Sequence, residues 1–120
     1  MAIKKVLVCD DSVTDLTRIK TIVEGAGYVT VTASSGVEAL SRAKAERPDI
    51  IFLDVIMPEM DGFEACRKLR QDPETKAIPI IFVTSKNQKA DRVWAQMQGA
   101  SDLIGKPYNP EQIIAKLKAA

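Results

Sequence analysis

Acidic, hydroxyl and basic side chains follow the apolar runs of this sequence. Asp10 and Asp11 follow one run, and three further runs lead into Asp54, Thr84 and Lys106. Neighbouring carboxylates repel one another and raise one another's pKa unless a cation is present, and Mg²⁺ suits one or two carboxylates together with phosphate oxygens. An aspartate can itself be the nucleophile that takes a phosphoryl group. Residues of these types predict phosphoryl chemistry if the fold brings them to one place.

Each of these residues also has a purely structural interpretation. An Asp-Asp-Ser sequence after a strand is often only a helix cap, Thr84 can be a strand-end hydroxyl, and Lys106 can be a surface charge. Chemistry is favoured because all of them follow predicted strands. The carboxyl ends of parallel strands form the edge at which α/β sheets build their binding and catalytic sites. There the lysine would supply a charge and the threonine a hydrogen bond to a phosphoryl group.

Short apolar runs predict five strands. The run before Asp54 is too short for a helix and suits a strand that is buried on both faces. The alternation of valine and threonine after Tyr28 indicates a half-solvated edge strand. The expected strands are Val6–Cys9, Tyr28–Ala33, Ile50–Asp54, Ile78–Val83 and Leu103–Ile104.

A helical pattern follows each predicted strand. Ser12, Ser35, Asp61 and Asn109 are placed as N-caps, and the Ser35-Gly36-Val37-Glu38 stretch has the form of a capping box. Five alternating strand-helix units predict an α/β fold, a doubly wound parallel sheet with helices on both faces, and a single domain over residues 1–120. In such a sheet Asp10, Asp11, Asp54, Thr84 and Lys106 would lie along one rim.

Composition argues against several classes of function. Seventeen basic and sixteen acidic residues give a net charge of +1, so no net field attracts nucleic acid or an anionic membrane. No apolar stretch reaches membrane-spanning length, and residues 1–9 are too short for a signal peptide. Cys9 and Cys66 are far apart and there is no histidine, so a zinc site is not expected. Both thiols are predicted to be free and buried in the protein, which we expect to lie in the reducing cytoplasm.

The whole chain resembles the receiver domain of bacterial two-component systems, in its stand-alone chemotaxis form. The resemblance rests on Asp10-Asp11-Ser12, Asp54 with Met57-Pro58 and Asp61-Gly62, Thr84-Ser85, and Lys106-Pro107. It implies that Asp54 accepts a phosphoryl group from the phosphohistidine of a histidine kinase. It also implies that Asp10, Asp11, Asp54 and the backbone carbonyl of Ile56 hold Mg²⁺, and that Thr84 and Lys106 bind the phosphoryl group.

The same resemblance implies a flavodoxin-like sheet in the order 2-1-3-4-5 and a cis Lys106-Pro107 bond. It implies a monomer without an output domain that signals through the face of its fourth helix, fifth strand and fifth helix, or drains phosphoryl groups from a shared kinase. Residues 86–94 and 98–100 further resemble receiver-only regulators of type IV pilus twitching motility and phototaxis. Trp94, in this stretch, is expected either to pack on the fourth helix or to dock a partner.

Leu103 departs from the receiver pattern, in which a tyrosine or phenylalanine usually stands three residues before the strand-five lysine. A leucine lacks the area and hydroxyl of the ring that couples to the threonine. We therefore expect a weaker or differently built switch, with repacking of the fourth helix around Trp94. Ile56 and Lys86 are expected to tune the lifetime of the phosphoryl group. The Ile56 side chain cannot hydrogen-bond an attacking water, whereas Lys86 could pair with a partner or with the phosphoryl group itself.

Three other functions compete with the phosphorylated switch. Leu103 favours a docking module of the same fold that does not use phosphorylation, whereas the intact acids and Lys106 favour the switch. A flavin- or nucleotide-binding protein is disfavoured because neither GxGxxG nor GxxxxGK[ST] follows a predicted strand. A Mg²⁺-dependent phosphatase with an aspartyl intermediate is disfavoured because the sequence contains no cap insertion.

Overall fold

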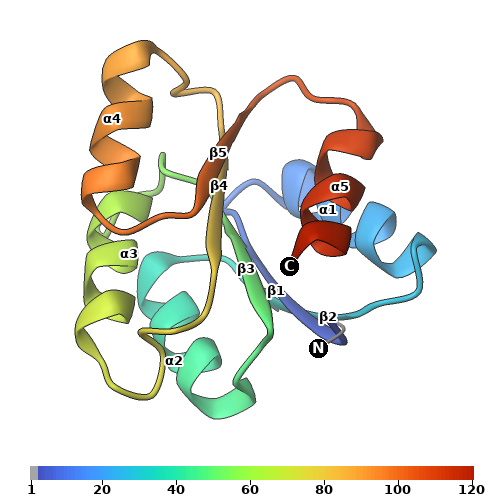
Figure 1. Cartoon of the computed structure of the whole chain (residues 1–120), viewed down its shortest axis with the longest axis horizontal. Coiled ribbons are helices and arrows are strands. Elements are labelled where there is room, and N and C mark those ends of the chain that lie inside the picture. Colours follow the sequence, from blue (N-terminus) through green and yellow to red (C-terminus); the bar gives the residue numbers. More distant parts are fainter. Residues whose placement is uncertain (1–2) are drawn as a thin grey trace.

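In the computed structural model, which describes residues 3–120, five parallel strands form a single sheet in the order β2-β1-β3-β4-β5 (Figure 1). This order and the parallel pairing confirm the predicted fold class. Met1 and Ala2, the first residues of the stretch considered as a signal peptide, lie outside the described residues. The strands are β1 (Lys5–Cys9), β2 (Val29–Ala33), β3 (Ile50–Leu53), β4 (Ile80–Thr84) and β5 (Asp102–Gly105).

Five helices cover the two faces of the sheet. Helices α1 and α5 pack on one face, and α2, α3 and α4 pack on the other (Figure 1). Within residues 3–120, no helix has the length and apolar character needed to cross a membrane. The helices are α1 (Val13–Gly25), α2 (Gly36–Glu46), α3 (Gly62–Gln71), α4 (Lys89–Met97) and α5 (Pro110–Ala119).

Alternate residues of the central strands feed two separate cores. Val6 and Val8 of β1 pack with α1 and α5, whereas Leu7 and Cys9 pack with α2, α3 and α4. The same alternation holds in β3 and β4, whose residues are all buried. An apolar run that is buried on both faces therefore needs no alternation of polarity, which is why these strands appear as unbroken apolar runs in the sequence.

Strand β4 begins two residues later than predicted. The amide of Ile78 donates to the carbonyl of Thr75 at 3.1 Å, so Ile78 belongs to a turn. Pro79 has no amide hydrogen to give to a sheet, although its carbonyl accepts from Ile51 at 3.0 Å. The prediction that β4 starts at Ile78 was wrong because the apolar run crosses this turn.

The predicted N-caps of α2 and α3 form, but the capping box of α2 is made differently. Ser35 Oγ accepts from the amide of Glu38 at 3.1 Å, as predicted. The Glu38 carboxylate reaches back to the amide of Ser34 at 2.7 Å rather than to Ser35. At α3, Asp61 accepts from the amide of Glu64 at 2.9 Å. Both helices thus start where the sequence indicated.

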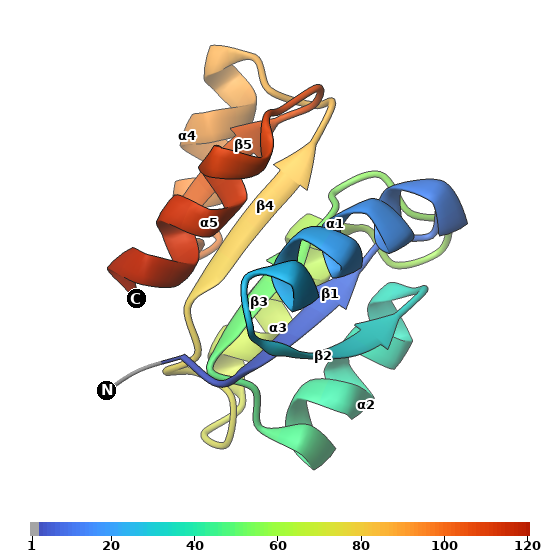
Figure 2. The same ribbon diagram turned by 90° about the vertical axis from the view of Figure 1, so that its right-hand side faces the viewer.

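The carboxyl ends of the strands form one rim, since all strands run in the same direction (Figure 2). Cys9 of β1 pairs with Leu53 of β3, and the amide of Asp54 continues this ladder by donating to Cys9 at 3.0 Å. Asp10 and Asp54 are therefore neighbours one residue beyond the paired strands. Gly62, the first residue of α3, allows a close approach here, because a Cβ atom would lie 2.1 Å from the carbonyl oxygen of Asp54.

Candidate functional site

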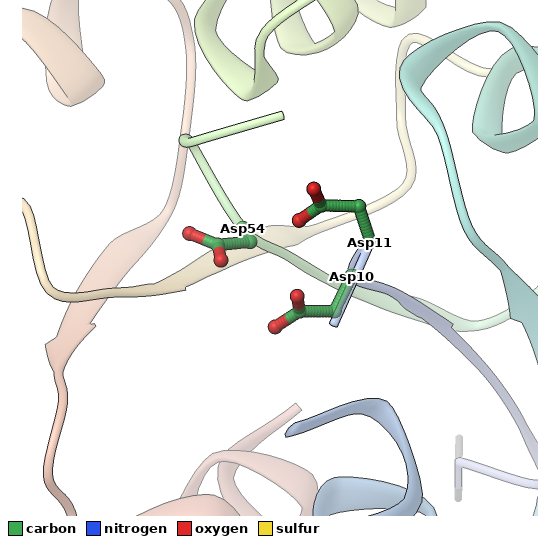
Figure 3. A group of neighbouring side chains, drawn as sticks. All are labelled: Asp10, Asp11 and Asp54. Carbon is green, nitrogen blue, oxygen red and sulfur yellow. The ribbon is translucent and has the colours of Figure 1, made fainter. Parts of the chain in front are cut away.

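Three carboxylates gather where β1 and β3 end. Asp10, Asp11 and Asp54 each offer one oxygen, and these oxygens all lie within 4.8 Å of one another (Figure 3). Asp10 and Asp54 are buried, whereas Asp11 is exposed. The structure thus brings together the acids that the sequence placed on one rim.

Lys106, which directly follows β5, is the cation at the centre of this cluster. Its Nζ donates to Asp10 Oδ2 at 2.9 Å and to Asp54 Oδ2 at 3.0 Å. A third hydrogen bond of 2.9 Å goes to Asp15 Oδ2. A lysine ammonium has three N–H donors, so these carboxylates occupy all of them.

Backbone amides hold the other oxygens of the two buried acids. Asp54 Oδ1 accepts from the amides of Val55 at 2.7 Å and Ile56 at 3.3 Å. Asp10 Oδ1 accepts from the amide of Ser12 at 2.9 Å. No buried side-chain nitrogen or oxygen in the described part of the chain lacks a partner. These bonds fix both carboxylates in one orientation and leave Asp54 Oδ2 to Lys106.

Burial and charge act in opposite directions on the pKa values of this cluster. Burial, with the nearby Asp54 carboxylate, raises the pKa of Asp10 in spite of the hydrogen bonds from Lys106 and Ser12, which lower it. Burial alone would lower the pKa of Lys106, but its hydrogen bonds to Asp10, Asp15 and Asp54 outweigh burial and raise it. Lys106 is therefore a permanent positive charge, and Asp10 is an acid whose ionised form is costly.

The donor set fits a hard divalent cation. Carboxylate oxygens at this spacing are ligands that Mg²⁺ accepts, with water or phosphate oxygens completing its shell. A soft metal such as zinc would instead need thiolate or imidazole ligands, and the sequence contains no histidine. The carbonyl of Ile56 as a further ligand stays a prediction; the structure gives a contact for its amide, which donates to Asp54.

Thr84 ends β4 beside Lys106. Its carbonyl accepts from the Lys106 amide at 2.9 Å, and its buried hydroxyl accepts from the Lys86 amide at 3.1 Å. The Lys86 ammonium lies 3.1 Å from Asp91 of α4, so its charge is paired there. The bond between Lys106 and Pro107 is cis, as the receiver resemblance implied.

Leu103 is buried in the core on the α4 side of the sheet, together with Ala95. The Leu103 carbonyl accepts from Arg92 Nη1 of α4 at 3.0 Å, which ties the helix to β5. Trp94 is exposed, yet its ring lies edge-on to Phe63 with centroids 6.5 Å apart. Trp94 therefore packs and remains accessible at once, and the two expectations for it are compatible.

Asp15 was not among the predicted site residues. This residue lies in the first turn of α1, where its amide donates to the N-cap Ser12 at 3.3 Å. An acid in a first helical turn is ordinarily explained by the helix dipole, so its type and position gave no reason to link it to Lys106. Only the folded structure reveals the ion pair, because Lys106 is far from Asp15 in the sequence.

The two cysteines are unpaired and buried. Burial, together with the Asp10 carboxylate, raises the pKa of Cys9 to about 12, and burial raises the pKa of Cys66 to about 11. A thiol with so high a pKa is not ionised near neutral pH and is a poor nucleophile. The cysteines therefore act as packing residues, as predicted.

Comparison with known proteins places this geometry in a family. The sequence model of the response regulator receiver domain matches residues 6–118. Protein PilH of Pseudomonas aeruginosa is 37% identical over 115 residues, which cover 96% of this chain and 95% of that protein. The chain therefore belongs to the response regulator receiver domain family, whose members are signalling switches of two-component systems and take a histidine kinase as partner.

Two further relatives differ in how much of their length is matched. The chemotaxis protein CheY4 of Vibrio cholerae superposes with a TM-score of 0.91 at 35% identity, covering 98% of each chain. The alkaline phosphatase synthesis transcriptional regulatory protein PhoP of Bacillus subtilis is 41% identical over 97% of this chain, which spans 48% of PhoP. The similarity therefore concerns the receiver fold itself and extends to proteins with additional sequence.

We expect Asp10→Asn to raise the free energy of unfolding near neutral pH, without metal, by on the order of 1 kcal/mol, because it removes a costly buried charge. The pKa of Asp10 is raised in the folded state, so the native protein binds more protons than the unfolded chain as pH falls. The free-energy cost of the buried charge should therefore shrink as pH falls through that raised pKa. The difference in stability between the variant and the native protein should shrink with it. Urea unfolding in a chelator at several pH values measures this.

Asp49→Asn is the matched control, with the opposite sign. Hydrogen bonds from the amides of Lys5 and Lys4 lower the pKa of Asp49, so its carboxylate stabilises the native state above the unfolded pKa. This variant should be less stable than the native protein near neutral pH, with a difference that also shrinks on acidification. A loss of stability in Asp10→Asn at neutral pH would contradict our account of the cluster.

Proposed function

We propose that this protein is a phosphorylated switch in which Asp54 accepts a phosphoryl group from the phosphohistidine of a histidine kinase, in a Mg²⁺-dependent reaction. One observation carries the proposal: the Asp54 carboxylate lies beside two further acids and accepts a hydrogen bond of 3.0 Å from a lysine. Phosphoryl transfer needs mainly positioning and charge neutralisation, and this arrangement offers both.

In the proposed transfer, an Asp54 oxygen attacks the phosphorus of the phosphohistidine. A P–O bond forms as the P–N bond breaks, and the imidazole leaves with the electron pair and takes a proton from solvent. The switch is turned off by hydrolysis. Water attacks the acyl phosphate and gives up a proton, the P–O bond to Asp54 breaks, and phosphate and the free carboxylate result. The switch therefore needs no separate catalytic nucleophile.

Residues around Asp54 have distinct proposed roles. Because the amides of Val55 and Ile56 hold Oδ1, Oδ2 is the oxygen proposed to attack, and Lys106, which already donates to Asp54, would also donate a hydrogen bond to a phosphoryl oxygen. Mg²⁺, when held by Asp10, Asp11 and Asp54, would neutralise charge on the phosphoryl oxygens. Thr84 accepts from Lys86 but keeps its own O–H, which is the donor proposed for another phosphoryl oxygen.

Two neighbours are proposed to affect the lifetime of the acyl phosphate. The exposed Ile56 side chain has no group that could hydrogen-bond an attacking water. The Lys86 ammonium pairs with Asp91, which competes with any contact that it could make to a phosphoryl group. Neither neighbour therefore offers a free polar group that would orient an attacking water.

The proposed output is a change in protein binding on the face of α4, β5 and α5. Exposed Val93, Trp94 and Met97 give α4 an apolar surface suited to a protein partner. The near balance of charge gives no support for nucleic acid as the partner. A monomer in the cytoplasm remains the expectation, and the similarity to PilH supports a role in chemotaxis-like control of pilus motility.

We expect intact-mass analysis of the native protein, after incubation with a small phosphodonor and Mg²⁺, to find one phosphoryl adduct. The adduct should be absent from Asp54→Ala and after addition of a chelator, because both the acceptor and the metal are required. Glu24→Gln, which changes an acid at the far end of α1, should be modified like the native protein.

A native protein that stays unmodified under conditions that charge another receiver would overturn this proposal. The alternative is then a docking module of the same fold that works without phosphorylation, and Leu103, which replaces the usual aromatic residue, is the feature that favours it. The same samples therefore separate the two functions.

We expect the amide spectra of native protein with and without beryllofluoride, a phosphoryl mimic, to differ most in α4 around Trp94. The reason is that Leu103 is already buried and lacks a ring that could turn inward, so the change must be taken up by α4 and its Arg92 contact with β5. Asp54→Asn is the control that should show no change. Similar spectra of the two states across α4, β5 and α5 would contradict this form of the switch.

A further inference from the structure

Asp15 provides the third acceptor for the Lys106 ammonium. The Asp15–Lys106 distance of 2.9 Å equals that from Lys106 to Asp10. Because the three N–H groups of Lys106 are all used, the ammonium can donate to an incoming phosphoryl oxygen only if one carboxylate lets go. In the resting state the Lys106 ammonium thus has no free donor for a new anion.

The three acceptors differ in how much water can replace the lysine. The Asp15 side chain is 41% exposed, whereas those of Asp10 and Asp54 are 1% and 8% exposed. A buried carboxylate that loses its cation is left uncompensated, but an exposed one is solvated at once. Asp15 is therefore the acceptor that costs least to release.

Asp15 is not needed to hold α1 in place. One turn later, Arg18 Nη2 donates to the carbonyl of Tyr108 at 3.3 Å, and its guanidinium carbon lies 5.0 Å from the centre of the Tyr108 ring. The N-cap bond at Ser12 uses the backbone amide of residue 15, so a side-chain substitution leaves it intact. The helix thus has an attachment to the segment after β5 that is independent of Lys106.

We infer that Asp15 is a positioning residue that holds Lys106 in the resting state and competes with the phosphoryl group for its ammonium, thereby slowing the charging of Asp54. This inference rests on the proposed function, in which Lys106 binds the phosphoryl group. The step only exchanges hydrogen bonds. Lys106 gives up its bond to the Asp15 carboxylate and donates to a phosphoryl oxygen, and water then hydrates Asp15.

The test compares charging rates by intact mass, with a small phosphodonor and saturating Mg²⁺ so that metal affinity does not enter. Asp15→Asn should charge faster than the native protein by up to about fivefold, the range of an exposed ion pair. Asp15→Glu, which keeps the negative charge, should charge at a rate close to the native value. Arg18→Gln, which weakens the other α1 attachment, should leave the rate within about twofold of native, the lower part of that range.

A second measurement observes Lys106 itself. In ¹⁵N spectra of the lysine ammonium groups, the signal lost in Lys106→Arg identifies Lys106. Its protons should exchange with water faster in Asp15→Asn than in the native protein or in Arg18→Gln. If Asp15 had a purely structural role, or if its negative charge only repelled the phosphodonor, the exchange rate of the Lys106 protons would not change.

The outcomes separate the two proposals. If the native protein is charged but Asp15→Asn is no faster, the role of Asp15 is overturned and the switch stands. If Arg18→Gln accelerates charging as much as Asp15→Asn, loosening of α1 is the cause and the inference is again overturned. If the native protein is not charged at all, the proposed function fails and this inference falls with it.

Discussion

Negative charge gathered at a sheet edge is the constraint on which this structure depends. Two of the carboxylates are buried, and the cation that compensates them, Lys106, arrives from a strand that pairs with neither of theirs. The order β2-β1-β3-β4-β5 leaves β4 between β3 and β5, so Lys106 must reach across the rim past Thr84. The position of every element at this edge therefore matters for the neutralisation of Asp10 and Asp54.

Such a cluster is better suited to switching than to stability. A buried ion pair recovers little more than the cost of removing its charges from water. Here the two cores on either side of the sheet supply the stability. The rim can therefore hold carboxylates whose ionised form is unfavourable, as the pKa of Asp10, raised by burial, shows. A divalent cation or a phosphoryl group would then relieve or rearrange an existing imbalance, which is the condition for a ligand to shift a conformational equilibrium.

The sequence predicted the parts of this arrangement that follow from strand ends and missed those that follow from packing. The acids after β1 and β3, the lysine after β5, and the caps of α2 and α3 were predictable because each is fixed by its neighbours in sequence. Asp15 was not, since an acid in a first helical turn has a sufficient local explanation. The turn at Ile78 and the contact of Arg92 with Leu103 were also missed, because they join residues whose apolar or charged type says nothing about their partner.

The measurement that tests the central claim most directly is chemical trapping of the acyl phosphate. After charging with a phosphodonor and Mg²⁺, borohydride reduction converts a phosphorylated aspartate into homoserine, which tandem mass spectrometry locates in the chain. Our account predicts homoserine at position 54 alone. Homoserine at Asp10 or Asp11, or none in a protein that carries a phosphoryl adduct, would contradict it, because the acceptor would then not be Asp54.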